Sequence, residues 1–124
     1  MLSDTQKTIL VVDDAPSNID VVKSILSETY LVQAAVNGKI ALKIAGIKKP
    51  DLILLDIIMP DMDGYEVCKA LKANSETAEI PVIFVTGKDQ NSDESEGLKL
   101  GAIGYIRKPV DPTELKTKVG ELLK

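Results

Sequence analysis

The side chains of this sequence that are suited to chemistry recur at one kind of place, at the end of a short apolar run. They are Asp13 and Asp14, Asp56, Thr86 and Lys108. Three carboxylates in one pocket repel one another strongly unless a cation joins them. A hard, all-oxygen ligand set of this kind suits Mg²⁺. If the runs bring these residues together, the sequence predicts a magnesium site.

Asp56 is the best candidate for the reacting group, because it directly follows the four aliphatic residues 52–55. A carboxylate is already ionised at neutral pH and needs no general base to act as a nucleophile. The metal, the Lys108 ammonium and the Thr86 hydroxyl are suited to hold the peripheral oxygens of an incoming phosphoryl group. The chemistry that these residues could do together is therefore formation of an aspartyl phosphate.

The apolar runs that position these residues read as β-strands alternating with amphipathic helices. We predict strands at 7–12, 30–36, 52–55, 80–86 and 104–107. We predict helices at 16–29, 40–49, 64–73, 91–100 and 112–123. Right-handed crossovers then give a doubly wound, three-layer α/β/α fold with a parallel sheet in the flavodoxin-like order 2-1-3-4-5. In that order the first and third strands are neighbours, which places Asp13, Asp14 and Asp56 at one sheet edge.

Local signals refine three of these elements. Asp111 and Glu114 predict a capping box at the start of the last helix. The helix at 91–100 has few apolar anchors and contains Gly97, at a cost of about 1 kcal/mol relative to Ala, so we expect it to be the least firmly docked. Cys68 is expected to be a small core residue.

The bulk composition bounds the class of protein. The chain of 124 residues is 44% hydrophobic and 27% charged, which predicts one folded domain over 1–124. A net charge of −4 with scattered cations argues against direct nucleic-acid binding. A single cysteine excludes an internal disulfide and a cysteine-based zinc site, and the absence of histidine excludes a Ser-His-Asp set. No signal peptide or membrane span is evident, so we expect a cytoplasmic protein.

The motifs around the candidate residues resemble the receiver domain of two-component response regulators, over essentially the whole chain. They are VVDD at 11–14, LLDIIMPDMDG at 54–64, VTG at 85–87 and GYIRKP at 104–109. The spacings agree as well, because Thr86 and Lys108 follow Asp56 by 30 and 52 residues (86 − 56 and 108 − 56).

The resemblance implies that Asp56 accepts a phosphoryl group from a partner histidine kinase or phosphotransfer protein. It implies Mg²⁺ held by Asp14, Asp56 and the main-chain carbonyl of Ile58. Asp13 would support the metal through water and face Lys108. The domain would then be a phosphoacceptor that catalyses its own phosphorylation and dephosphorylation rather than an enzyme with a separate substrate.

The resemblance also assigns a switch. The Thr86 hydroxyl would move toward the phosphoryl group and the Tyr105 ring would turn inward, which changes the surface of the fourth helix, fifth strand and fifth helix. That surface would control a downstream target or a fused output domain, or form a phosphorylation-dependent dimer. The Lys108-Pro109 bond is expected to be cis. Ile58 and Lys88 are expected to flank the phosphoryl group, with Ile58 hindering the attacking water.

Three other interpretations stay open from the sequence. A flavodoxin-like electron carrier shares the fold, but the chain has only four aromatic residues and no Ser/Thr-Gly phosphate loop after its first strand. An aspartyl phosphatase would resemble a DxD pattern rather than adjacent Asp13-Asp14. A receiver-like docking module would keep the fold without the phosphorylation. Because the chain ends with its fifth helix, we expect no output of its own, as a stand-alone regulator or as a domain of a longer protein.

Overall fold

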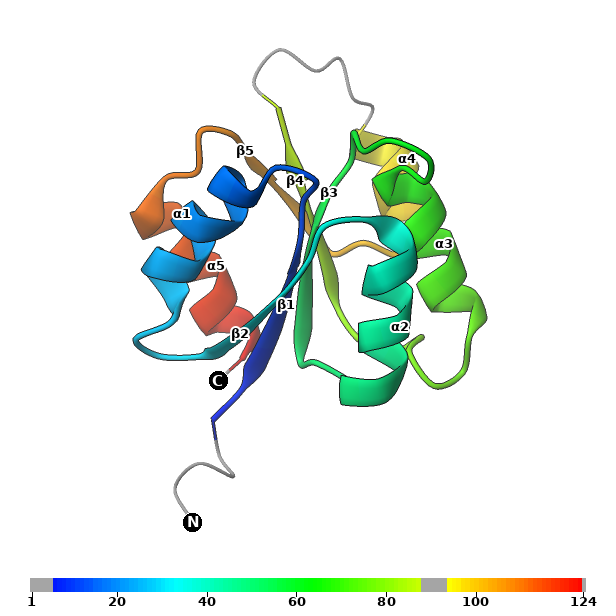
Figure 1. Ribbon diagram of the computed structural model, residues 1–124, viewed down its shortest axis with the longest axis horizontal. Helices are drawn as coiled ribbons and strands as arrows, with labels where there is room; N and C mark the ends of the chain where they lie inside the picture. Colours follow the sequence, from blue (N-terminus) through cyan, green and yellow to red (C-terminus); the bar gives the residue numbers. More distant parts are fainter. Residues whose placement is uncertain (1–5, 88–93, 124) are drawn as a thin grey trace.

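The computed structural model describes residues 6–87 and 94–123, in which five strands alternate with five helices (Figure 1). The strands are β1 (Thr8–Val12), β2 (Leu31–Ala35), β3 (Leu52–Asp56), β4 (Val82–Thr86) and β5 (Gly104–Arg107). The helices are α1 (Pro16–Leu26), α2 (Gly38–Lys48), α3 (Gly64–Ala73), α4 (Glu94–Lys99) and α5 (Pro112–Leu122). Within the described residues no helix has the length and apolar character needed to cross a membrane.

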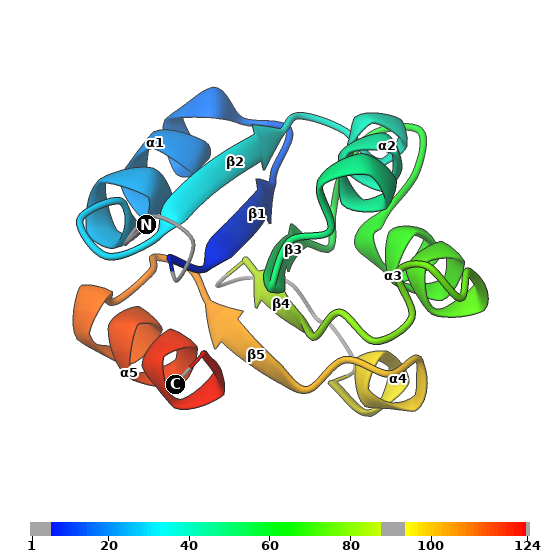
Figure 2. The same ribbon diagram turned by 90° about the horizontal axis from the view of Figure 1, so that it is seen from below.

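The strands form one parallel sheet in the order β2-β1-β3-β4-β5, as the sequence predicts. Helices α1 and α5 cover one face, and α2, α3 and α4 cover the other (Figure 2). In the register Val12 lies opposite Leu55, and Asp56 lies opposite Val85. The residues that follow β1 therefore lie level with the end of β3, where the winding of the sheet reverses.

The core explains why the central strands are apolar without alternation. Every residue of β3 and of β4 is buried, because helices cover both faces of the sheet. Alternate side chains divide between the layers: Phe84 packs toward α2 and α3, and Ile83 packs toward α1 and α5. Cys68 has no exposed surface and lies in the first of these clusters, so its predicted core position is confirmed.

The capping box occurs at a different helix from the one predicted. At α5 the Asp111 side chain accepts a hydrogen bond from the Thr113 N–H, while Glu114 lies 3.5 Å from Lys118 on the same helix. The predicted reciprocal bond, from the Asp111 N–H to the Glu114 carboxylate, is therefore wrong. At α3, Asp63 and Glu66 form both bonds of a capping box, which fixes the start of the helix that follows the Asp56 loop.

Several helix and strand ends differ from the prediction by two or three residues. Helix α1 ends at Leu26 rather than near 29. Helix α2 begins two residues earlier than predicted, because the Asn37 side chain accepts from the Ile40 N–H and caps it. Strand β4 begins at Val82, after Pro81, which has no N–H to donate to a ladder. Residues 91–93 of the predicted fourth helix lie outside the described residues.

Candidate functional site

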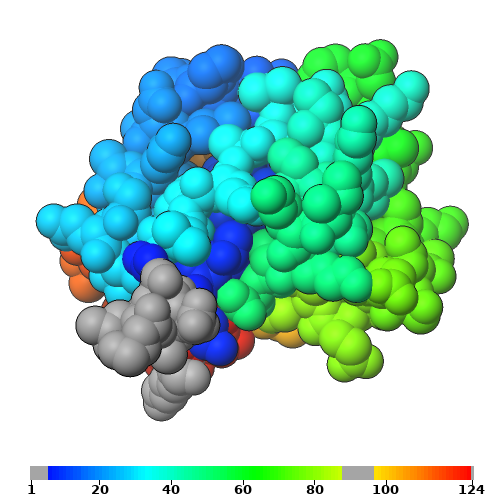
Figure 3. Space-filling view, turned by 60° about the horizontal axis from the view of Figure 1, so that its bottom comes forward, coloured from blue at the N-terminus to red at the C-terminus, as the bar shows by residue number. Residues whose placement is uncertain are grey.

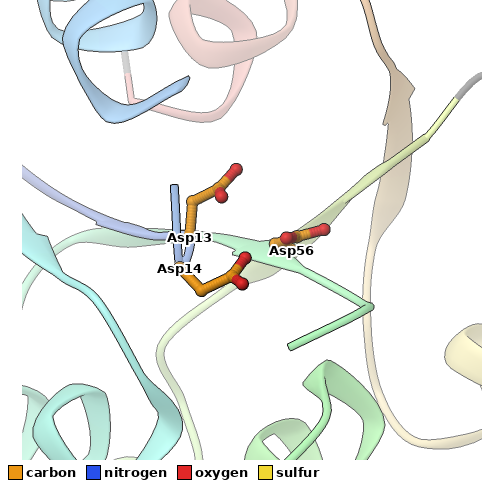
Figure 4. A group of neighbouring side chains, drawn as sticks. All are labelled: Asp13, Asp14 and Asp56. Carbon is orange, nitrogen blue, oxygen red and sulfur yellow. The ribbon is translucent and has the colours of Figure 1, made fainter. Parts of the chain in front are cut away.

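Three carboxylates meet at the carboxyl ends of β1 and β3. One ligand oxygen from each of Asp13, Asp14 and Asp56 lies within 4.8 Å of the others, and Figure 4 shows the three residues grouped together. Asp13 and Asp56 are only 4% and 3% exposed, whereas Asp14 is exposed. The structure thus brings together the three acids that the sequence placed at one edge, with the Asp14 side open to solvent.

Lys108 joins this cluster from the end of β5. Its Nζ donates a hydrogen bond to Asp13 Oδ2 at 2.9 Å and lies 3.5 Å from Asp56 Oδ1. The Lys108-Pro109 bond is cis, as expected, and the Lys108 N–H donates to the Thr86 carbonyl at 2.7 Å. Burial lowers the pKa of Lys108, but its hydrogen bond to Asp13 and the charges of Asp56 and Asp13 outweigh this and raise it overall. One ammonium therefore stays charged among three carboxylates.

Asp56 is the least satisfied member of the cluster. Its pKa is raised to about 6, first by burial and then by the neighbouring Asp13 charge, and Lys108 opposes this shift only in part. Among the described residues, its buried Oδ1 atom has no hydrogen-bond partner. A buried, incompletely paired carboxylate is costly unless a cation reaches it. The donor chemistry and the excess negative charge therefore fit a hard cation such as Mg²⁺.

Asp13 is held in place by groups that sequence reasoning missed. Its Oδ1 accepts hydrogen bonds from the Ala15 N–H at 2.9 Å and from Asn18 Nδ2 at 3.3 Å. These two bonds leave Oδ2 to receive the Lys108 ammonium. Asn18 lies in the first turn of α1. An amide side chain in the turn directly after two aspartates is the signal that could have identified it.

Thr86 and Tyr105 lie behind the acid cluster on β4 and β5. Thr86 is fully buried, and its Oγ1 has no hydrogen-bond partner among the described residues. Tyr105 is 9% exposed and its ring packs against Phe84 at 5.5 Å between centroids, so the ring already lies inward. A Cβ on Gly97 would overlap the Tyr105 hydroxyl and lie 2.7 Å from Phe84 Cε2. Sequence reasoning missed this role for Gly97 and Phe84.

The loop after β3 places Ile58 at the surface beside the site. Ile58 is 60% exposed between the buried side chains of Ile57 and Met59. Gly64 closes the loop, because its N–H donates to the Ile57 carbonyl at 2.7 Å and a Cβ there would overlap the Asp56 carbonyl. Metal ligation by the Ile58 carbonyl stays a prediction. Lys88, the other predicted flanking residue, lies outside the described residues.

Fold and site together define a doubly wound α/β domain with an acidic cluster at its switch point. The family model for the response regulator receiver domain matches residues 9–120, so the chain belongs to that family. Members are receiver domains of two-component systems, and their standard function is to accept a phosphoryl group on an aspartate from a histidine kinase. The resemblance inferred from the motifs is confirmed, which sets aside the electron carrier and the aspartyl phosphatase.

Relatives of very different length share this domain. A probable cyclic di-GMP phosphodiesterase of Vibrio cholerae is 49% identical over 115 residues, which cover 93% of this chain and 26% of that protein. Protein PilH of Pseudomonas aeruginosa is 38% identical over 116 residues, covering 93% of this chain and 96% of PilH. The chain thus spans about a quarter of the first relative and nearly all of the second.

Solved structures agree with the assignment of the fold. The crystal structure of a putative response regulator from Chloroflexus aurantiacus is similar with a TM-score of 0.88 and 30% identity. The match covers 95% of this chain and 98% of that one.

Proposed function

We propose that Asp56 is the phosphoacceptor of this receiver domain, assisted by Lys108 and Thr86. The observation that carries this assignment is the buried, hydrogen-bond-free Asp56 Oδ1, which lies 3.5 Å from a lysine ammonium at the centre of the acid cluster. This oxygen is ionised near neutral pH in spite of its raised pKa, which makes it nucleophilic. Neither Asp13 nor Asp14 combines these properties, because Asp13 is hydrogen-bonded and Asp14 is exposed.

The metal belongs to the same proposal. Asp14, Asp56 and the main-chain carbonyl of Ile58 would hold Mg²⁺, with Asp13 supporting it through water. When bound, the ion supplies positive charge that offsets the three carboxylates and the oxygens of the phosphoryl group. Asp13 and Asp14 directly follow β1 and Asp56 ends β3, and these two strands are neighbours in the sheet, so the fold already brings the three acids together.

The chain's own residues perform the transfer. An Asp56 carboxylate oxygen forms a bond to phosphorus while the bond from phosphorus to the donor, a phosphohistidine nitrogen or an acyl oxygen, breaks with its electron pair leaving on the donor. The Lys108 ammonium, already within 3.5 Å of Asp56, binds one peripheral oxygen. The buried Thr86 hydroxyl, which needs a partner, donates to another. In the second step water attacks phosphorus, and the bond from phosphorus to the Asp56 oxygen breaks with its electron pair leaving on the carboxylate. This releases inorganic phosphate and regenerates Asp56, so the domain supplies the chemistry of both steps.

The signal would pass from the acid cluster to a partner through β4, β5 and the helices beside them. A new hydrogen bond from Thr86 pulls the end of β4, and Phe84 on the same strand lies opposite Tyr105 on β5. The face formed by α4, β5 and α5 carries exposed apolar side chains, among them Leu98, Ile103 and Leu122. We infer that this α4-β5-α5 face contacts a downstream target, an output domain or a second copy of the domain.

The remaining expectations belong to the same proposal. The donor is a histidine kinase or phosphotransfer protein, and the domain works in the cytoplasm, where its single buried cysteine stays reduced. A net charge of −4 supports a protein rather than a nucleic acid as the direct partner of this domain.

Acetyl phosphate tests the acceptor without a kinase. The native chain is incubated with acetyl phosphate and Mg²⁺ and its intact mass is measured beside Asp56→Asn. The matched control is Asp61→Asn, which changes an exposed aspartate in the same loop, at a positive φ of 71° that asparagine tolerates. We expect one added phosphoryl group on the native chain and on Asp61→Asn, and none on Asp56→Asn. Phosphorylation of Asp56→Asn, or none on any of the three, contradicts the proposal.

A further inference from the structure

A cavity of about 160 Å³ lies beside the acid cluster, on the face of the sheet that α1 and α5 cover. Its walls come from α1 and from the connection that leads from β5 to α5, which run beside each other in Figure 1. The residues of these walls are Asn18, Val21 and Val22 on α1 and Lys108, Pro109 and Val110 on the connection. Apolar side chains of the central strands form its floor.

The cavity is chemically unlike the acid cluster that it adjoins. Its lining is mostly apolar, and its two charged residues, Asp13 and Lys108, are hydrogen-bonded to each other at 2.9 Å. A small anion is opposed by the excess of carboxylates, and a small cation gains more from the open acid cluster than from valine and proline walls. The lining therefore favours an uncharged ligand.

We propose that this cavity binds a small, uncharged, apolar molecule with about six non-hydrogen atoms. The size follows from comparison with an engineered apolar cavity of about 150 Å³, which stays dry and binds benzene or xenon. Val21 is 48% exposed, so a ligand can enter beside it without opening the sheet. We expect a dissociation constant for benzene on the order of 1 mM.

Occupancy also has a consequence for the neighbouring site. Asp13 and Lys108 contribute to the cavity and to the acid cluster alike. A ligand packed against Lys108, Pro109 and Val110 restrains the segment that carries the ammonium, and so changes the affinity of the cluster for Mg²⁺. This consequence rests on the proposed metal site, whereas the binding of the apolar molecule does not.

Methyl NMR of the whole chain tests the binding. Benzene is titrated into protein with labelled valine, leucine and isoleucine methyl groups. We expect saturable shifts at Val21, Val22 and Val110, and none at Leu98 on α4 or at Ile103 just before β5, neither of which lines the cavity. Shifts that do not saturate, or that centre on other methyl groups, overturn the proposal.

A filling variant and its control make the test specific. Val21→Phe places a ring at the entrance and should weaken benzene binding at least tenfold, while Ile47→Phe adds the same ring at a position on α2 that is 68% exposed and should leave it unchanged. Equal affinity in the two variants overturns the proposal. A crystal of the native chain under xenon pressure is a second measurement, with xenon expected between α1 and Val110 and its absence there counting against the site.

The effect on the metal is measured separately. We expect the dissociation constant for Mg²⁺ to change at least twofold at saturating benzene in the native chain and to stay constant in Val21→Phe. Benzene binding with an unchanged Mg²⁺ affinity overturns the coupling and leaves the cavity site standing. Failure to bind Mg²⁺ at all contradicts the proposed function instead.

Discussion

The acid cluster and the aromatic contact beneath α4 are two buried regions of one sheet with opposite construction. In the cluster, Asp56 Oδ1 lies 3.5 Å from the Lys108 ammonium and accepts no hydrogen bond from the described residues. In the aromatic contact, the ring centroid of Phe84 lies 5.5 Å from that of Tyr105 and 5.2 Å from that of Tyr65. Gly97, which has no side chain, leaves space for the Tyr105 hydroxyl. The acid cluster therefore has an excess of negative charge, whereas the aromatic contact is fully packed.

The comparison teaches how the two regions can be linked. Thr86 lies between them, because it ends the strand that carries Phe84 and pairs with the strand that carries Tyr105. Its hydroxyl is buried and has no hydrogen-bond partner among the described residues, so under the proposed function we expect it to gain one when a phosphoryl group arrives on Asp56. On this proposal, a change of charge at the acid cluster would change the packing of the aromatic contact.

Removing the Lys108 ammonium should have the largest effect on stability of the changes considered. In Lys108→Met without Mg²⁺, two buried carboxylates lose their cation, and we expect the free energy of unfolding to fall by about 3 kcal/mol. Denaturant unfolding measures this, with Lys39→Met, an exposed lysine of α2, as the control. Mg²⁺ should restore part of the loss. Equal stability of Lys108→Met and Lys39→Met would show that the pair contributes nothing.

Removing the charge of Asp56 should raise the free energy of unfolding, the opposite of the effect of removing Lys108. The pKa of Asp56 is raised from 3.8 to about 6, so the folded state binds this proton more tightly than the unfolded state and stability is lost as pH rises through that range. Without Mg²⁺ near neutral pH, we expect Asp56→Asn to be more stable than the native chain by on the order of 2 kcal/mol.

The pH dependence of that difference supplies its control. The advantage of Asp56→Asn should shrink as the pH falls from 6 toward 4, because the native carboxyl then becomes neutral as well. Unfolding curves across this range measure it, and a difference that is independent of pH would contradict the role assigned to burial of the charge.

Two glycine substitutions test how tightly the aromatic contact is packed. Gly97→Ala should cost about 1.5 kcal/mol, since its methyl group needs the space that Tyr105 and Phe84 occupy. Gly120→Ala in α5, where nothing lies within 4 Å of the new methyl group, should instead stabilise the fold by about 0.8 kcal/mol. Thermal unfolding distinguishes the two, and tyrosine fluorescence should change only in Gly97→Ala. Stabilisation by both would mean that the Tyr105 ring is not confined there.

The smallest effect concerns the lifetime of the phosphorylated form. Ile58 is 60% exposed and two residues from Asp56, where we expect a bulky apolar side chain to hinder the approach of water. Ile58→Asn should increase the dephosphorylation rate by about threefold, which corresponds to less than 1 kcal/mol of barrier. Loss of the phosphoryl group over time measures the rate. An unchanged rate would dismiss the steric explanation.

The sequence predicts the convergence of the acids well because topology alone decides it. Buried, unbroken apolar runs require a parallel sheet, and the carboxyl ends of parallel strands share an edge, so Asp13 and Asp56 have to meet there. The contact of Asn18 with Asp13 depends instead on a side-chain rotamer, which spacing does not fix. Gly97 shows the same limit: the sequence marks it as a weakness of a helix, whereas the structure shows that it makes room for Tyr105.

The central claim is that phosphorylation occurs on Asp56 and depends on a cation at the acid cluster. It is tested most directly by digesting the chain after incubation with acetyl phosphate, in Mg²⁺ and in EDTA, and locating the phosphoryl group by fragment mass. The account predicts one modified site, Asp56, and incorporation that is lost with EDTA. Modification of any other residue, or undiminished modification of Asp56 without a divalent cation, would contradict it.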